Sequence, residues 1–169
     1  MLSADVGGVM MITVKRILVP TDFSETSDAA LEYASGLAQT FDAQLYLLHV
    51  PGKTGENFEA DFPINQFEKV ARERLETLVS QQEARELRPE YAMRIGTPSD
   101  EILRYADDRD IDLIVMGTHG RSGVAHMLLG SVAEKVVRGA MCPVLTVRHP
   151  RRAFVRSELA TAHAAHEQK

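Results

Sequence analysis

Apolar residues along the chain fall into short runs, separated by longer segments with helical spacing. Residues 16–20, 44–50 and 112–117 are apolar almost throughout, which is typical of strands buried on both faces. Residues 90–95 alternate between apolar and polar, so they predict an edge strand with one solvated face. Residues 143–148 predict a last strand whose leading proline is tolerated at a strand start or edge.

Between these runs, apolar residues recur three and four positions apart and predict four helices. The first helix buries Ala30, Ala34, Leu37 and Phe41. The second is predicted as one long helix with Phe67, Ala71, Leu75, Leu78 and Gln82 on one face. The third begins with Thr97 as N-cap, Pro98 at its first position, and Asp100 and Glu101 in the first turn. The fourth is lined by Val132, Ala133, Val136, Val137 and Ala140.

Strands and helices therefore alternate along the whole chain. This order predicts an α/β fold, a doubly wound, Rossmann-like parallel sheet of five strands with helices on both faces. Such sheets bind ligands beyond the carboxyl ends of their strands, where the strand order reverses. Residues 20–24, 50–54 and 117–131 follow strands and are expected at that edge.

The segment from Gly117 to Ser131 holds four of the eleven glycines and connects a buried strand to a helix. One interpretation is a phosphate site, because a helix N-terminus offers unpaired N–H groups and partial positive charge. Ser131 would add a hydroxyl donor and Arg121 a cation. The other interpretation is a long turn whose glycines supply positive φ angles.

Composition argues against a nucleic-acid-binding, membrane-spanning or secreted protein. The net charge of −5 argues against a broad basic surface for nucleic acid. No apolar stretch approaches the ~20 residues that cross a bilayer, and the first residues lack the basic start of a secretory signal. The single cysteine, Cys142, allows no internal disulfide and is expected as a small core residue of a cytoplasmic protein.

Other motifs fail on their spacing. Residues 52–54, Gly-Lys-Thr, lack the earlier glycine of a phosphate-binding P-loop, since Leu47 stands there. His119 and His126 have no third ligand at metal spacing, so no metal site is predicted, and His49 is expected as a satisfied core histidine. The carboxylates of residues 107–112 are expected to be solvated charges away from the ligand edge. No local signature of a catalytic nucleophile is present, and no catalytic residue is assigned.

The spacing Gly117-x-x-Gly120, nine residues, then Gly130-Ser131 resembles the nucleotide-binding signature of the universal stress protein family. The similarity extends from Lys15 to Arg148 and includes "ILVPTDFSETSDAAL", "GTPSDEIL" and "DLIVMGTHGRSG". The resemblance implies the strand order 3-2-1-4-5. It also implies bound ATP, with Mg²⁺, because the glycine signature is complete.

Position by position, the resemblance implies three groups of ATP contacts. Pro20, Thr21 and Asp22 would lie along adenine and ribose, and the Val50 backbone would contact the adenine edge. Met116 and Gly117 would lie beside the ribose. The phosphates would be held by His119, Gly120, Arg121, Gly130, Ser131 and Val132.

The family also implies a homodimer through the last strand, Val144, Leu145, Thr146 and Val147. Pairing there would cover backbone groups that an edge strand leaves exposed. Residues 15–149 would form the nucleotide-binding domain, with an N-terminal extension, 1–14, and a polar C-terminal tail, 150–169.

Two functions remain open. The first is a cytoplasmic stress-response module regulated by ATP binding. The second is an enzyme that slowly hydrolyses ATP or phosphorylates its own Ser122 or Ser131. The loop after the first strand lacks the glycines of related ATP-cleaving folds, and no general base is evident beside the phosphate loop, so the first is favoured.

Overall fold

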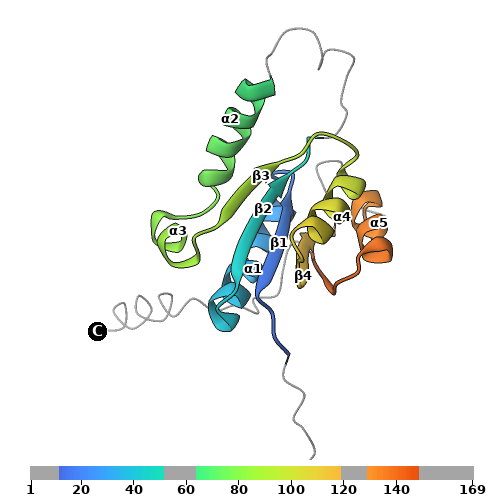
Figure 1. Cartoon of the computed structure of the whole chain (residues 1–169), viewed down its shortest axis with the longest axis horizontal. Coiled ribbons are helices and arrows are strands. Elements are labelled where there is room, and N and C mark those ends of the chain that lie inside the picture. Colours follow the sequence, from blue (N-terminus) through green and yellow to red (C-terminus); the bar gives the residue numbers. More distant parts are fainter. Residues whose placement is uncertain (1–11, 52–63, 119–128, 149–169) are drawn as a thin grey trace, which may run out of the picture.

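The computed structural model of the protein describes residues 12–51, 64–118 and 129–148. A five-stranded parallel sheet in the order β3-β2-β1-β4-β5 forms its centre (Figure 1). The strands are β1 (Arg16–Thr21), β2 (Gln44–His49), β3 (Glu90–Met93), β4 (Leu113–Gly117) and β5 (Val144–Val147). The predicted doubly wound sheet, its strand order and the edge positions of β3 and β5 are confirmed. The solvated face predicted for β3 is wrong: all four of its residues are half-buried, because Tyr91 packs against one core and Ala92 against the other.

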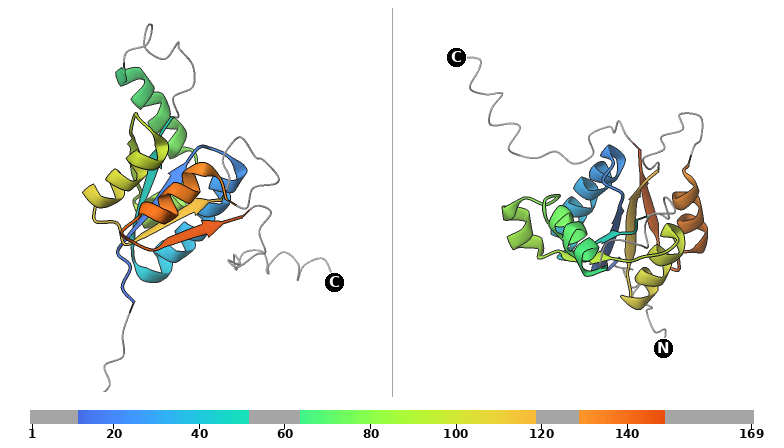
Figure 2. Two further views of the ribbon diagram at one scale, coloured as in Figure 1. Left: turned by 90° about the vertical axis from the view of Figure 1, so that its right-hand side faces the viewer. Right: turned by 90° about the horizontal axis from the view of Figure 1, so that it is seen from above.

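Helices cover both faces of the sheet (Figure 2). One face carries α1 (Glu25–Phe41), α2 (Ile64–Glu76) and α3 (Gln81–Leu87), and the other carries α4 (Pro98–Asp108) and α5 (Ser131–Gly139). Successive strand residues alternate between the two cores: Ile17 and Val19 pack toward α1, whereas Leu18 packs toward α4 and α5. All three are fully buried, which explains why the apolar run has no polar face.

The prediction of one long helix over residues 67–82 is wrong, because the structure has two helices there, α2 and α3. Tight i→i−3 bonds from Thr77 and Leu78 end α2. Ser80 then starts α3 with a capping box, accepting the N–H of Glu83 while the Glu83 carboxylate accepts the N–H of Ser80. The spacing Ser80-x-x-Glu83 is the sequence signal that could have predicted this break.

Other helix predictions hold with two corrections. The buried stripe of α1 is confirmed, with Ala30 and Ala34 inaccessible to solvent. Pro98 stands in the first turn of α4, but the side chain of its N-cap, Thr97, makes no capping hydrogen bond. On α5, Val137 is 45% exposed rather than buried, because the helix contacts the sheet mainly through Ala133 and Val136.

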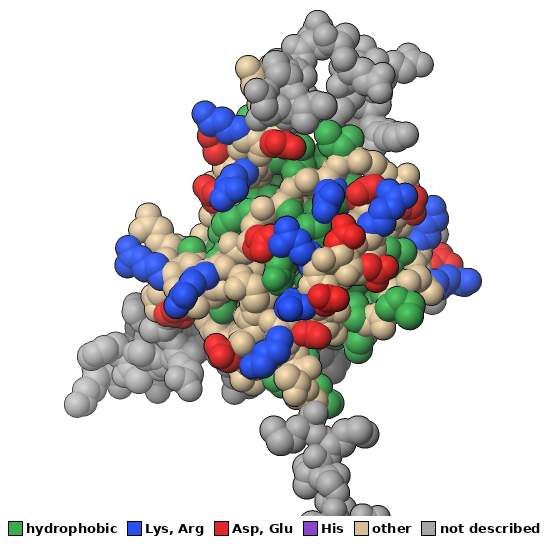
Figure 3. Space-filling view, viewed as in Figure 1, with side chains coloured by type: hydrophobic (Ala, Val, Ile, Leu, Met, Phe, Trp, Pro, Cys, Tyr) green, Lys and Arg blue, Asp and Glu red, His purple; other side chains and the backbone are tan. Residues whose placement is uncertain are grey.

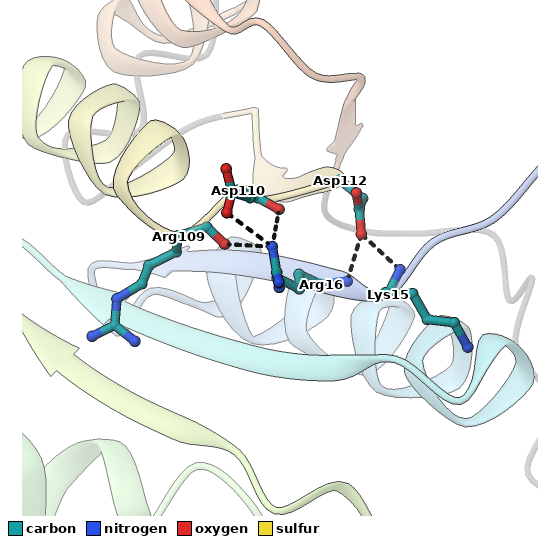
Figure 4. A network of polar contacts seen from close by, with 5 residues as sticks. All are labelled: Lys15, Arg16, Arg109, Asp110 and Asp112. Carbon is teal, nitrogen blue, oxygen red and sulfur yellow. Dashed lines mark hydrogen bonds and ion pairs between the residues drawn. The ribbon is translucent and has the colours of Figure 1, made fainter.

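The carboxylates of residues 107–112 are not all solvated charges, contrary to the prediction. One oxygen of Asp112 accepts the N–H groups of Lys15 and Arg16 at 2.7 and 2.8 Å, and Arg16 also pairs with exposed Asp110 at 3.3 Å (Figure 4). Asp112 thus joins the amino end of β1 to the turn before β4. As expected, these residues lie at the opposite end of β1 from its ligand edge.

On the face drawn in Figure 3, basic and acidic side chains are interspersed. Among the described residues, exposed or half-exposed ion pairs include Arg94–Asp108 at 3.4 Å and Arg109–Glu90. Cys142 is half-buried against the core beneath α4 and α5, as expected, and this partial burial raises the pKa of its thiol. Within the described ranges, no helix is both long enough and apolar enough to cross a membrane.

Candidate functional site

The strand order reverses between β1 and β4, because the chain adds β2 and β3 on one side of β1 and β4 and β5 on the other. We call the segments that meet here the switch-point edge: residues 21–23 at the end of β1 and just beyond it, 117–118 at the end of β4 and just beyond it, and 130–131 at the start of α5. Parallel sheets bind ligands at such an edge. Several of the residues singled out in the sequence therefore come together where the fold predicts a site.

The turn from β1 into α1 is fixed by its own polar groups. The Thr21 hydroxyl is buried, lies 3.0 Å from the Ser27 hydroxyl, and accepts the N–H of Phe23 at 3.0 Å. The Asp22 carboxylate accepts the N–H of Ser24 at 3.1 Å. Ser24 is the N-cap of α1, and its side chain accepts the N–H of Ser27. The backbone of this segment is thus held in one conformation before any ligand binds.

The end of β2 supports the same turn. His49 Nδ1 lies 2.8 Å from the Thr21 carbonyl oxygen, and because a carbonyl only accepts, the imidazole N–H donates. The ring of Phe23 lies against the imidazole of His49, with ring centroids 4.5 Å apart. His49 is half-buried and hydrogen-bonded, as predicted for a satisfied core histidine. Val50, which follows it, is buried.

The start of α5 lies against the end of β4. Gly130 is the N-cap, with extended φ and ψ of −70° and 155°, and its N–H donates to the Thr118 carbonyl at 2.7 Å. A positive φ angle therefore does not explain this glycine. The N–H groups of Ser131, Val132 and Ala133 occupy the first turn of α5, where helical N–H groups lack an intrahelical acceptor. Ser131 is exposed and Val132 half-buried.

Gly117 has a packing reason to be glycine. A Cβ atom there would lie 2.8 Å from Thr26 Cγ2 and 3.1 Å from the Thr26 backbone. The absence of a side chain lets α1 lie directly against the end of β4. Met116, the residue before it, is buried on the opposite face, toward α4 and α5.

Charge differs between the two sides of the switch-point edge. Near α1, burial and then the carboxylates of Asp22, Glu25 and Glu32 raise the pKa of Asp28, while Arg74 opposes the shift. This side is therefore unfavourable for phosphate. The N-terminus of α5 instead carries partial positive charge, which favours an anion. An anion is therefore favoured at the start of α5 and disfavoured beside α1.

Some of the residues predicted to contact a nucleotide lie at the switch-point edge, and others lie outside the described residues. Pro20, Thr21 and Asp22 lie at the end of β1 and just beyond it, and Val50 follows β2. Met116 and Gly117 end β4, and Gly130, Ser131 and Val132 begin α5. His119, Gly120 and Arg121 lie outside the described residues, as do His126, Ser122 and the Gly-Lys-Thr segment at 52–54.

Sequence reasoning missed three residues at this edge. Thr118 accepts the N–H of Gly130, Phe23 lies against His49, and the guanidinium of Arg74 in α2 lies 4.0 Å from the centre of the Phe23 ring. Phe23 stands in the motif "PTDFS", which could have drawn attention to it. Nothing local marks Arg74, which occupies an ordinary polar position on a helix. Among the described residues, no group of three or more side chains is arranged to hold a metal ion.

A doubly wound sheet with a pre-formed turn and a helix N-terminus at its switch point defines the class of Rossmann-like α/β proteins. Residues 13–148 match the family described as "Universal stress protein family". The chain belongs to this family.

Individual relatives agree with this assignment. Universal stress protein MJ0531 of Methanocaldococcus jannaschii is 35% identical over 143 residues, covering 82% of this chain and 84% of its own length. The solved structure of MJ0577, from the same organism, has a TM-score of 0.69 and 31% identity, with 83% of this chain and all of that chain covered. A universal stress protein from Archaeoglobus fulgidus, solved in complex with dAMP, has a TM-score of 0.53 and 25% identity, covering 81% and 99%.

Proposed function

We propose that this protein is a cytoplasmic, ATP-binding regulatory module of the stress response. The observation that carries the proposal is the meeting of the Thr21–Asp22 turn and the α5 N-terminus at the switch-point edge. The dAMP complex of the Archaeoglobus relative supports an adenine nucleotide as the ligand. Residues 15–149 would form the binding domain, flanked by extensions 1–14 and 150–169.

The residues present fit a nucleotide at this edge. Thr21 and Asp22 would hold the nucleoside end, with adenine contacted by the backbone of Val50, and Met116 and Gly117 would lie beside the ribose. Ser131 and Val132 would donate their N–H groups to phosphate, joined by His119, Gly120 and Arg121. Gly130, whose own N–H is held by Thr118, would contribute by leaving room beside the helix start. Mg²⁺ would bind through the phosphates, as it commonly does.

The proposed assembly is a homodimer through β5. This strand is an edge of the sheet, and Leu145 on it is 38% exposed, while nearby Met141 is 89% exposed. Pairing of two β5 edges would cover backbone groups and these apolar side chains together.

Nucleotide binding is tested on protein freed of any co-purified nucleotide. Mg-ATP at one hundred times its dissociation constant should stabilise the fold by about 2.7 kcal/mol, read as a rise in melting temperature. GTP should give a smaller rise in melting temperature. The proposed contact is between the backbone of Val50 and the edge of adenine, and guanine presents a different edge to the same backbone groups. No rise at millimolar Mg-ATP would overturn the proposal. Recovery of ADP rather than ATP from the purified protein would instead indicate turnover.

A further inference from the structure

Four non-glycine residues among those described have positive φ angles: Phe23, Asp42, Arg88 and Asp110, at 62°, 51°, 43° and 47°. Three of them have an ordinary explanation. Asp42 and Arg88 are the C-caps of α1 and α3, and Asp110 follows the end of α4. Helices often end in a left-handed residue, and aspartate tolerates this conformation. Phe23 differs, because it precedes a helix and has a bulky side chain.

Such backbone strain persists only where surrounding contacts hold it, and it is concentrated at functional sites. Phe23 is held by three elements. Its N–H donates to the Thr21 hydroxyl at 3.0 Å in β1, its ring lies 4.5 Å from that of His49 in β2, and Arg74 in α2 lies 4.0 Å from the ring centre. The last contact is a cation–π interaction.

These contacts converge on Thr21. Its hydroxyl accepts from Phe23, and its carbonyl accepts from His49, the ring partner of Phe23. Asp22, between Thr21 and Phe23, is oriented by the same turn and accepts the N–H of Ser24. Phe23, Thr21 and Asp22 are therefore linked in one turn at the switch-point end of β1.

We propose that Phe23 is a positioning residue for nucleotide binding: its left-handed conformation, held by His49 and Arg74, fixes the turn that starts at buried Thr21 and thereby places Asp22 for the ligand. The proposal rests on the proposed ATP binding. It extends the site to α2, through Arg74, a residue more than fifty positions from β1 in sequence. Phe23 itself need not touch the nucleotide.

The central test is Phe23→Gly, measured by ATP titration calorimetry and by urea unfolding. Glycine adopts the same φ without strain but removes the ring that holds the turn. ATP affinity should fall about five- to tenfold, the loss expected when about one hydrogen bond to the ligand is misplaced. Phe23→Tyr keeps the ring and should bind ATP within about twofold of the wild type.

Asp42→Gly is the matched control, since it relieves the same kind of strain at the opposite end of α1. It should leave ATP affinity unchanged. Equal affinities of Phe23→Gly and the wild type, or equal losses in Phe23→Gly and Asp42→Gly, would overturn the positioning role while leaving ATP binding intact. A wild-type protein that binds no ATP would instead overturn the proposed function and this inference with it.

If Phe23→Gly does not fold, the comparison of Phe23→Leu with Phe23→Tyr tests the positioning role of the ring. Phe23→Leu keeps an apolar side chain and the strained backbone but loses the aromatic ring. It should bind ATP more weakly than Phe23→Tyr. Equal affinities in these two variants would show that the ring does not position the turn.

Discussion

The N–H of Gly130 donates to the carbonyl oxygen of Thr118 at 2.7 Å. This bond joins the two ends of the glycine-rich connection directly, and Thr118 itself donates to the Val147 carbonyl at 2.8 Å. The start of α5 is thereby attached to the carboxyl ends of β4 and β5. These two backbone hydrogen bonds help to hold the helix N-terminus at the switch-point edge, together with the packing of Ala133 and Val136 in the core.

The first prediction concerns Gly130, whose φ of −70° suits any residue. Gly130→Val should therefore fold but lose ATP binding, because its side chain would intrude on the proposed phosphate site. Ser131→Ala should weaken binding by about 0.5–1.5 kcal/mol, the usual contribution of one hydrogen bond. Calorimetry and melting temperature are measured for both variants. A folded Gly130→Val protein with normal ATP affinity would show that the segment is only a turn.

The second prediction concerns the contact between Gly117 and α1. Gly117→Ala should lower the free energy of unfolding by about 1–3 kcal/mol, because its Cβ would meet the Thr26 backbone at 3.1 Å and α1 must shift. Gly139→Ala is the control, since its Cβ would meet only the movable end of Leu103. Urea unfolding should show a loss of less than about 1 kcal/mol there. Similar losses at both positions would argue against the packing explanation.

The third prediction concerns Asp112. Asp112→Ala leaves the N–H groups of Lys15 and Arg16 without their acceptor and should cost about 1–2 kcal/mol of unfolding free energy. Asp110→Asn removes only an exposed ion pair and should change it by less than about 0.5 kcal/mol. Denaturant titration compares the two variants. An equal effect would mean that both carboxylates act as simple surface charges.

The fourth prediction concerns pH and Asp28, whose pKa is raised above its ordinary value of 3.8 by burial and then by neighbouring carboxylates. A raised pKa means that the ionised form is disfavoured in the folded state. The resulting penalty is present above the folded pKa and disappears as the pH falls below 3.8. Asp28→Asn should therefore raise the free energy of unfolding near neutral pH, by an amount that solvent screening at this exposed position keeps small, and the gain should disappear as the pH falls below 3.8. A gain that is independent of pH would contradict this explanation.

The fifth prediction concerns assembly. Leu145→Lys places a charge on the β5 edge and should shift a wild-type dimer toward monomer in sedimentation velocity. Ile95→Lys is the control, because Ile95 is 49% exposed and follows β3 at the opposite edge of the sheet. It should leave the dimer intact. A wild-type monomer at micromolar concentration would refute dimerisation through β5.

Most elements and their layering could be predicted from the sequence, although the division of one predicted helix into α2 and α3 was not. The apolar run at the start of β1 is buried on both faces, and the alternating pattern around Tyr91 belongs to an edge strand, as predicted. The glycine-rich connection correctly marked the start of α5. These features are readable because burial of a strand or helix face imposes a local period on the residues.

Contacts between segments far apart in the sequence could not be predicted and depend on the folded sheet. Asp112 accepts from Lys15 across 97 positions, and Arg74 of α2 reaches the ring of Phe23. The local period of apolar residues indicates only which side chains are buried. Asp112 precedes a strand and Arg74 lies on a polar helix position, so a polar residue at either place gives no sign of a distant partner. Which partner such a side chain meets depends on how the elements pack, because the crossovers bring the ends of different strands together only in the folded sheet.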